Sequence, residues 1–329
     1  MRKGVTFIGS LIVDSIKIID RYPPPGNLCN IVEISRCVGG LAANTSIDLK
    51  VLAPELEVAA AGMVGDDESG AYLTGKIASY GIDISGIRKH PSLPTSFTDV
   101  MTETDTGVRT FFQAQGACAA FGADDIDFDG INTTNAHVGY ALLLNRLDKP
   151  DPDFGSEMGR VLRTLRRRGI ETSIDLVTET GDRYQTVILP CLPYVDVLFM
   201  NEIEASCTTG LTLCDENGLV LEDKARDACA ALLARGVQKL VVIHAPQGGW
   251  AMTKDGSFFF QPSLRLPDGY IKGTVGAGDA FCAGMLYALA NSLGPEEGLR
   301  IANLAAAANL SSSNSIDGMK PLAELRGSL

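Results

Sequence analysis

Residues 272–281 contain a glycine-rich turn that ends in an acid. The acid, Asp279, precedes an apolar run from Ala280 to Ala290 that has the length and composition of a buried helix. The first N–H groups of a helix lack partners within it, and with the helix dipole they form a natural site for phosphate. A carboxylate in this place would repel a phosphate, so its presence needs a reason. Removal of the proton from an attacking hydroxyl supplies one, and the segment therefore predicts phosphoryl transfer with Asp279 as the base. The alternative is a packing turn in which Asp279 is only a favourable helix-terminal charge.

Two further segments carry groups that suit a hydroxyl-rich ligand. Gly39 and Gly40 permit close contact between the backbone and a ligand, and Asn44, four residues on, offers both a donor and an acceptor. Asp14 follows the first predicted strand, where an acid can accept hydrogen bonds from hydroxyl groups. The alternatives are a tight turn with a capping asparagine and an ordinary loop acid.

Asn201 and Glu204 directly follow a predicted strand at 195–200. Ligand sites in parallel sheets lie at the carboxyl ends of the strands. An amide and a carboxylate three residues apart share one face of a first helical turn, and together they can hold hydrated Mg²⁺ near phosphates. The alternative is a helix cap in which Glu204 completes a capping box.

Short apolar runs alternate with amphipathic stretches along most of the chain, which is typical of βαβ units. The alternation predicts an α/β fold whose central sheet is mostly parallel and covered by helices. Glycines that fit helix C-terminal caps follow three of the stretches, at Gly81, Gly169 and Gly236. The strand candidates are 5–13, 58–64, 137–144, 171–176, 195–200 and 239–243, and the helix candidates are 42–52, 70–80, 154–168 and 221–234.

Two segments, at about 15–38 and 94–114, break this pattern because apolar and polar residues alternate in them. The second contains a turn at 104–107 and is typical of a β-hairpin. We expect the two segments to form a small antiparallel sheet that acts as a lid and excludes water from the site. Residues 1–329 contain no repeat or linker and are expected to form a single domain with this lid. Exposed lid strands could also pair across a homodimer.

Composition excludes several functional classes. The 329 residues carry a net charge of -12, which argues against a nucleic-acid partner. The 3 histidines lack metal-ligand spacing and the 8 cysteines include no C-x-x-C pair, so neither a zinc enzyme nor a disulfide framework is expected. No run reaches the roughly 18 apolar residues of a membrane helix, and Asp14 interrupts the apolar N-terminal run. We therefore expect a reduced, cytoplasmic protein without membrane contact.

These segments, in this order, resemble the PfkB, or ribokinase-like, family of carbohydrate kinases. The family's D-T-x-G-A-G-D signature corresponds to residues 273–279, its paired glycines and asparagine to 39–44, and its N-x-x-E motif to 201–204. Residues 62–70 and 109–117 also look like family segments, so the resemblance spans nearly the whole chain. It implies a ribokinase-like fold, with three α/β/α layers, a mostly parallel central sheet and a small β-sheet lid.

The resemblance implies an ATP- and Mg²⁺-dependent kinase that transfers the γ-phosphate to a primary hydroxyl of a small sugar. It implies that Asp279 is the catalytic base, and that the anion hole is formed by the backbone amides of Gly276, Ala277 and Gly278. Asn201 and Glu204 would organise the ATP phosphates and Mg²⁺, the metal through water. The residues implied to hold the sugar are Asp14, Gly39, Gly40 and Asn44, and those implied on the nucleotide side are Thr274, Gly248 and Asn309.

Two positions depart from the family's pattern. Gly273 stands where the signature has an acid that helps to hold a monovalent cation in many relatives, so the sequence does not predict potassium activation. The family's nucleotide-side T-x-G-x-x-G corresponds to residues 243–248, where Ala245 replaces a glycine and Ile243 replaces the threonine. These replacements alter the adenine or ribose side of the predicted site.

Two alternative functions remain open. A nucleoside kinase of the same fold would need an apolar slot for a base, which Phe97, Phe111 and Phe112 could supply. A catalytically weak, sugar-binding regulatory protein would account for the two altered motifs, although the Asp279 turn is intact. Arg109 is grouped with the substrate-binding residues, because it could contact an acidic or phosphorylated sugar; alternatively it is a solvated charge on the lid.

Overall fold

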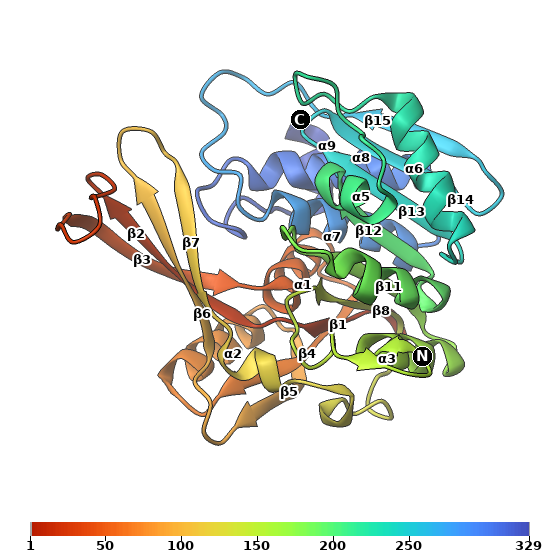
Figure 1. The fold of residues 1–329 in the computed structure, drawn as a ribbon, viewed down its shortest axis with the longest axis horizontal. Coiled ribbons are helices and arrows are strands. Elements are labelled where there is room, and N and C mark those ends of the chain that lie inside the picture. The colour runs from red at the N-terminus through yellow and green to blue at the C-terminus, as the bar shows by residue number, and fades with distance from the viewer. Residues whose placement is uncertain (1, 329) are drawn as a thin grey trace.

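The large sheet contains nine strands among residues 2–328, which the computed structural model describes. The strand order is β15-β14-β13-β12-β11-β8-β1-β4-β5 (Figure 1). All neighbouring pairs from β13 to β5 are parallel, whereas β14 and β15 are antiparallel additions at one edge. The α/β fold with a mostly parallel sheet is therefore confirmed. The bounds are β1 Arg2–Gly9, β4 Glu57–Gly65, β5 Asp83–His90, β8 Thr133–Ala141, β11 Glu171–Leu176, β12 Val197–Asn201, β13 Leu240–Ala245, β14 Gly248–Thr253 and β15 Phe258–Pro262.

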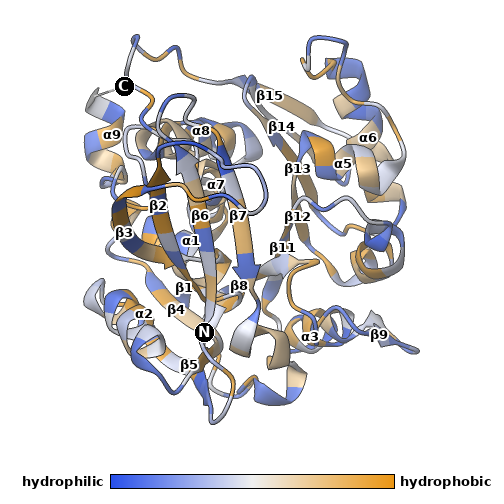
Figure 2. Cartoon of the chain, turned by 60° about the vertical axis from the view of Figure 1, so that its left-hand side comes forward, coloured by the Kyte–Doolittle hydropathy of each residue, from blue (hydrophilic) through white to orange (hydrophobic). Residues whose placement is uncertain are grey.

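Helices cover both faces of this sheet. Helices α3, α5 and α6 pack on one face, and α1, α2, α7 and α8 pack on the other, with α9 against α8. Successive residues of a strand point to opposite faces, so Phe199 enters the α7 layer while Leu198 and Met200 enter the α6 layer. Hydrophobic residues accordingly concentrate in the central strands (Figure 2). The helix bounds are α1 Leu41–Leu52, α2 Glu68–Ser79, α3 Glu157–Arg167, α4 Leu189–Cys191, α5 Glu202–Thr209, α6 Glu222–Ala234, α7 Ala277–Ala290, α8 Pro295–Asn309 and α9 Leu322–Ser328.

A separate small sheet projects from one side of this body (Figure 1). Its strand order is β3-β2-β6-β7, and the strands come from the two segments that break the βαβ pattern. The expected hairpin is present, since β6 and β7 are antiparallel. The sheet as a whole is mixed rather than antiparallel, because β2 and β6 run parallel. The bounds are β2 Ile12–Ile19, β3 Ile31–Gly39, β6 Ser96–Glu103 and β7 Arg109–Ala114.

Two predicted strands differ from the observed ones. The candidate at 5–13 is two strands, because β1 ends at Gly9 and the chain passes through Ser10 and Leu11 into the small sheet. A Cβ at Gly9 would lie 1.7 Å from the carbonyl oxygen of Gly139, so the backbones approach each other at this exit from the sheet. The candidate at 137–144 begins four residues earlier, at Thr133, because β8 starts with polar residues that the apolar run does not include. The Thr133 hydroxyl lies 2.7 Å from the Thr6 hydroxyl of β1.

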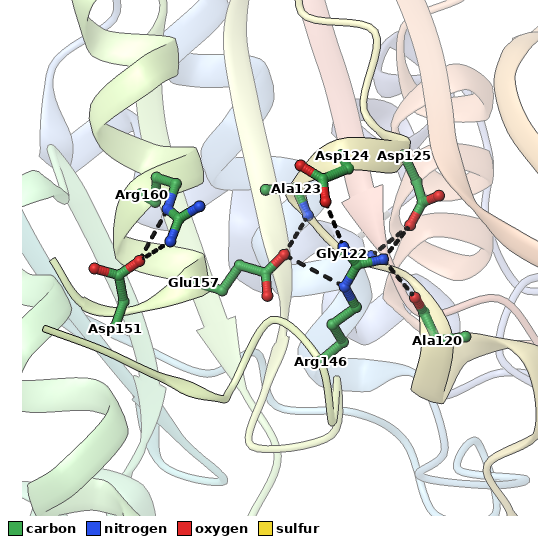
Figure 3. A network of polar contacts seen from close by, with 9 residues as sticks. All are labelled: Ala120, Gly122, Ala123, Asp124, Asp125, Arg146, Asp151, Glu157 and Arg160. Carbon is green, nitrogen blue, oxygen red and sulfur yellow. Dashed lines mark hydrogen bonds and ion pairs between the residues drawn. The ribbon is translucent and has the colours of Figure 1, made fainter.

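Arg146 fixes the connection between β8 and α3. Figure 3 shows its guanidinium among carboxylates, with Nη2 2.6 Å from Asp124 and Nη1 3.2 Å from Asp125. Its Nε lies 3.6 Å from Glu157, the first residue of α3. This side of the molecule is therefore held by charge pairs as well as by apolar packing. Within residues 2–328, no helix combines the length and apolar character needed to cross a membrane.

Candidate active site

The turn before α7 leaves backbone N–H groups open at the helix N-terminus. Gly276 caps the helix in the left-handed region, with φ 82°. The first intrahelical bond runs from the N–H of Ala280 to the carbonyl of Gly276, at 2.8 Å. The N–H groups of Gly278 and Asp279 therefore have no carbonyl partner within the helix. The helix begins at Ala277 rather than at Ala280, so Asp279 is its third residue and not the residue before it.

Asp279 is almost fully buried and accepts three side-chain hydrogen bonds. Asn44 Nδ2 donates to Oδ2 at 3.0 Å, Thr45 Oγ1 donates to Oδ1 at 3.0 Å, and Tyr140 Oη donates to Oδ1 at 2.5 Å. Burial raises the pKa of Asp279, and these three donors oppose that shift. The side chain is thus fixed in place and has a carboxyl group that binds a proton more readily than an exposed aspartate.

A loop near the C-terminus connects the two glycine-rich turns. The hydroxyl of Ser315 donates to Asn44 Oδ1 at 3.0 Å. A Cβ on Gly276 would lie 2.7 Å from Ser315 Cα, so this loop also packs directly on the turn before α7. The amide of Asn309 donates to the Ser315 carbonyl at 2.7 Å and holds the loop from within the core. Gly40 has φ 83° and lies close to the carbonyl of Ser10. Only a glycine tolerates both this backbone conformation and this close contact.

Asp14 lies in β2, opposite Thr98 in β6 and Cys37 in β3. Burial raises the pKa of Asp14 to about 7, while hydrogen bonding with Thr98 opposes the shift and the charge of Asp279 adds to it. A Cβ on Gly39 would lie 2.4 Å from Asp14 Oδ2, so glycine is required there to admit the carboxylate. Asp14, Gly39, Gly40 and Asn44 are therefore brought to one place beside Asp279.

Asn201 and Glu204 form a complete capping box at the start of α5. Asn201 Oδ1 accepts from the N–H of Glu204 at 2.8 Å, and Glu204 Oε2 accepts from the N–H of Asn201 at 2.9 Å. Glu204 Oε1 also accepts from the hydroxyl of Thr178, at 2.8 Å. The capping interpretation is thus correct. Glu204 Oε1 accepts a second bond from Asn201 Nδ2, at 2.9 Å, whereas Asn201 Oδ1 and Glu204 Oε2 each keep a free lone pair. The pair therefore fits Mg²⁺ held through water better than direct coordination.

A cavity of about 180 Å³ brings the Asn201 pair and the Asp279 turn together. Burial raises the pKa of Glu204, and it raises the pKa of Asp175 well above its usual range, where the charges of Glu204 and Asp279 add to the effect. The residues that line the cavity are Tyr140, Asp175, Leu176, Asn201, Glu204, His244, Gly276, Gly278 and Asp279.

A second cavity, of about 480 Å³, shares His244 and Gly278 with the first. It is lined mainly by apolar side chains, among them Phe281 of α7, and by Thr274 of the turn. Its size is typical of small-molecule sites, which range from roughly 300 to 1,000 Å³. Gly248 and Asn309 do not line it: Gly248 is the first residue of β14, directly after the turn from β13 and against the carbonyl of Gln261, and Asn309 faces Ser315.

Arg109 and the three phenylalanines of the small sheet are divided between its two faces. The strand register places Arg109 and Phe111 on the same face as Asp14, and both line a third cavity. Phe97 and Phe112 alternate to the opposite face. The expected slot formed by Phe97, Phe111 and Phe112 together is therefore wrong, because only Phe111 is on the side of the site.

Several site residues lie outside the sequence motifs. Thr45 follows Asn44 directly in α1, and Tyr140 lies near the carboxyl end of β8, a position that is a general signal for ligand sites in parallel sheets. Asp175, near the end of β11, carries the same signal. Its carboxylate, the His137 ring and the Cys282 thiol offer atoms within 4.8 Å of one another, and Cys282 donates to Asp175 Oδ2 at 3.5 Å. Ser315 lies in a serine-rich loop without any distinguishing pattern.

The buried carboxyl group of Asp48 should make the stability of the folded protein depend on pH. Its side chain is fully buried in α1, and within residues 2–328 neither carboxyl oxygen has a hydrogen-bond partner. Burial raises the pKa of Asp48 well above its usual range, and the charge of Asp279 adds to this. The folded state thus holds a proton that the unfolded chain releases above a pH of about 4. The free energy of unfolding should therefore fall as the pH rises, by up to about 1.4 kcal/mol per pH unit for this group.

Replacement of Asp48 by asparagine tests this dependence. The variant should unfold with a shallower pH slope between pH 5.5 and 8 and should be more stable than the wild type at pH 8. Urea unfolding at several pH values measures both quantities. The exposed Asp105, changed to asparagine, serves as the control that should leave the slope unchanged. Equal slopes in wild type and Asp48→Asn would show that Asp48 is ionised in the folded protein.

Comparison with known proteins gives a consistent result. The profile of the pfkB family carbohydrate kinases matches residues 2–321. An ATP-dependent ribose-1-phosphate kinase of Halopiger xanaduensis is 27% identical over 285 residues, which is 87% of this chain and 84% of that protein. A 5-dehydro-2-deoxygluconokinase of Photobacterium profundum is 24% identical over 321 residues, 92% of this chain and 88% of that protein.

Similarity to solved structures extends over the whole fold. The structure of Arabidopsis thaliana ribokinase complexed with ribose and ATP superposes with a TM-score of 0.82. The two chains are 22% identical, and the match covers 99% of this chain and 98% of the other. The likeness confirms the ribokinase-like three-layer fold.

Proposed function

Because this chain belongs to the pfkB family of carbohydrate kinases, and is thus a phosphotransferase with an alcohol group as acceptor, we propose that it transfers the γ-phosphate of ATP to a primary hydroxyl of a small sugar. One observation carries this proposal. The carboxylate of Asp279 lies at the open N-terminus of α7, in a cavity that continues at Gly278 into the apolar cavity. A hydroxyl and a transferring phosphate can therefore meet at this point.

In the proposed reaction Asp279 accepts the hydroxyl proton while the acceptor oxygen bonds to the γ-phosphorus. The bond from that phosphorus to the β,γ-bridging oxygen breaks, and ADP leaves. The N–H groups of Gly276, Ala277 and Gly278 stabilise the negative charge on the transferring group in this proposal, that of Ala277 in exchange for its 3.4 Å hydrogen bond to the Thr274 carbonyl. Mg²⁺, held through water by Asn201 and Glu204, would neutralise phosphate charge.

We assign the apolar cavity of about 480 Å³ to the base and ribose of the nucleotide. Thr274 and Gly278 at its rim are then close to the phosphates. Gly248 and Asn309 contribute indirectly in this proposal, Gly248 by allowing the turn beside the cavity and Asn309 by holding Ser315. Gly273 offers no carboxylate for a monovalent cation, and a Cβ there would lie 3.0 Å from the Ser312 carbonyl oxygen.

The sugar is proposed to lie between the small sheet and α1, with its hydroxyls on Asp14, Gly39, Gly40 and Asn44. The names of the relatives include a sugar phosphate and a sugar acid as well as ribose, so the acceptor need not be neutral. ADP formation, measured with a panel of sugars, sugar phosphates, sugar acids and nucleosides, tests the proposal. Turnover of nucleosides alone would favour a nucleoside kinase of the same fold, and absence of turnover with all acceptors would refute the assignment.

Titration of Asp14 should produce an acidic limb in the pH profile of kcat/KM for the acceptor. Burial raises the pKa of its carboxyl to about 7, and only the ionised form accepts hydrogen bonds at both oxygens. The value of kcat/KM for the acceptor should therefore rise as the pH increases to about 7 and level off above it. Asp14→Asn should lower kcat/KM at pH 8 by roughly 10- to 100-fold, because a hydrogen bond to a charged group is lost.

Substitution of Asp14 shows whether this residue or another titrating group produces the acidic limb. It should disappear in Asp14→Asn and persist in Asp20→Asn, which alters an exposed acid just beyond β2. Initial rates from pH 5.5 to 9 provide the comparison. An unchanged limb in Asp14→Asn would assign the titration to another group, such as Asp279.

A further inference from the structure

We propose that the acceptor is an anionic sugar, with a phosphate or carboxylate group that is bound by Arg109 and Lys272. This inference rests on the proposed kinase function and specifies its substrate class. It follows from a third cavity, of about 590 Å³, between the small sheet and the segment before α7. The residues that line this cavity are Gly107, Arg109, Phe111, Ile271, Lys272, Gly273, Thr274 and Val275.

The two cations in this cavity are not neutralised by the protein. Within residues 2–328, neither Arg109 nor Lys272 forms an ion pair with a carboxylate; the hydrogen bond of the Arg109 guanidinium goes to the Ser313 carbonyl, at 3.4 Å. Lys17, another cation of the small sheet, is instead paired with Asp99. In a chain with a net charge of -12, two unpaired cations that face one cavity leave a site for an external anion.

Both cations are anchored where their charges can be directed into the cavity. The backbone N–H of Lys272 donates to the Leu310 carbonyl at 2.8 Å, so the residue's main chain is fixed while its side chain stays exposed. Arg109 begins β7, opposite Thr102 of β6, and therefore shares a face with Asp14. A planar guanidinium and a nearby ammonium suit the oxygens of a phosphate or a carboxylate.

The position of Arg109 relative to Asp14 and Asp279 favours the acceptor, rather than the nucleotide, as the ligand that Arg109 binds. Arg109 acts electrostatically on the Cys37 thiol, where it lowers the pKa that burial and the charges of Asp14 and Asp317 raise. Cys37 pairs with Asp14 across β2 and β3, so Arg109 acts on the part of the site assigned to the sugar. Asp14 and Asp279 would repel an anionic sugar unless cations offset them, and Arg109 and Lys272 supply that offset.

The test compares acceptors that share a free primary hydroxyl but differ in charge. D-ribose is the neutral probe, ribose 1-phosphate carries a phosphate and gluconate carries a carboxylate. With the full-length enzyme, the preferred anionic acceptor should have a kcat/KM at least tenfold above that of ribose. Which of the two anions is preferred distinguishes a sugar phosphate from a sugar acid.

Arg109→Gln then identifies the binding group. It should lower kcat/KM for the preferred anion by roughly 10- to 100-fold, mainly through KM, and change the values for ribose and the KM for ATP less than threefold. Arg109→Lys should restore part of the loss. Arg36→Gln is the matched control, since Arg36 lies on the opposite face of the small sheet, beside Ser69 and Glu68.

Three results would overturn the inference. Turnover of ribose equal to or faster than that of both anions would refute it while leaving the kinase assignment intact. A rise in the KM for ATP in Arg109→Gln, with the acceptor KM unchanged, would assign Arg109 to the nucleotide phosphates. Absence of ADP formation with every acceptor would refute the proposed function and this inference together.

Discussion

Asp279→Asn is expected to lower kcat by roughly 10²- to 10⁴-fold, the usual contribution of a general base. Asparagine keeps the shape of the side chain and an oxygen for the Thr45 and Tyr140 donors but cannot accept the hydroxyl proton. The acceptor KM should change less than kcat, because Asp14 is untouched and Asn44, although it loses its acceptor on residue 279, is still held by Ser315. Steady-state ADP formation at saturating ATP measures both parameters.

A matched control separates lost chemistry from lost stability. Asp196 is also a buried carboxylate, and it accepts from the N–H and the hydroxyl of Thr172, at 3.0 and 3.1 Å. It directly precedes β12, at the opposite edge of the sheet from the candidate site. Asp196→Asn should therefore reduce Tm without reducing kcat at a temperature where the variant is folded. A kcat of Asp279→Asn within threefold of the wild type would exclude Asp279 as the base.

Gly276→Ala is expected to lower kcat by roughly 10²- to 10³-fold, as loss of one anion-hole donor does. Alanine at φ 82° costs about 1 to 2 kcal/mol, and its Cβ would lie 2.7 Å from both Cα and Cβ of Ser315. Relief of that contact must move the turn away from Ser315 and displace the open N–H groups. The acceptor and ATP KM values should change less than kcat, because the contacts assigned to ground-state binding lie elsewhere.

Gly210→Ala isolates the backbone component of this effect. Gly210 ends α5 with φ 78°, and a Cβ there would have no heavy atom within 4 Å. The variant should lose about as much stability from its backbone conformation as Gly276→Ala does, yet retain wild-type kcat. Urea unfolding and ADP formation on both variants provide the comparison. Equal kcat values in the two glycine variants would show that the turn at Gly276 does not position the transferring group.

The sequence could locate most of the candidate site because a parallel sheet gathers the carboxyl ends of its strands at one edge. Asp14, Asn201 and the turn before Asp279 each stand beside a recognisable strand or helix boundary. The same reasoning does not single out Tyr140 or Ser315, since the end of β8 is recognisable but not which of its residues contacts Asp279, and a serine among serines carries no pattern. Their roles depend on contacts between residues far apart in the chain, such as Tyr140 with Asp279.

The small sheet shows a similar limit. Alternation of polar and apolar residues identified its strands and one hairpin, but alternation does not specify the partner of a strand. The parallel pairing of β2 with β6 joins segments more than 80 residues apart, as in the pair Lys17 and Met101. The same register separates Phe97 and Phe112 from Phe111, which composition alone placed together.

The hydrogen bonds around Asp279 also determine how much of the chain must be synthesised before the candidate site can form. Asn44 and Thr45 precede Asp279 by 235 and 234 residues, and Ser315, which binds Asn44, follows it. Strands β1, β4 and β8 and helix α1 can assemble while the ribosome is still translating the second half of the chain. The proposed base, its donors and the loop that holds them meet only after residue 315 has emerged. In the proposed mechanism, phosphoryl transfer therefore requires nearly the whole chain, and a product that ends before residue 315 can be folded in part without being active.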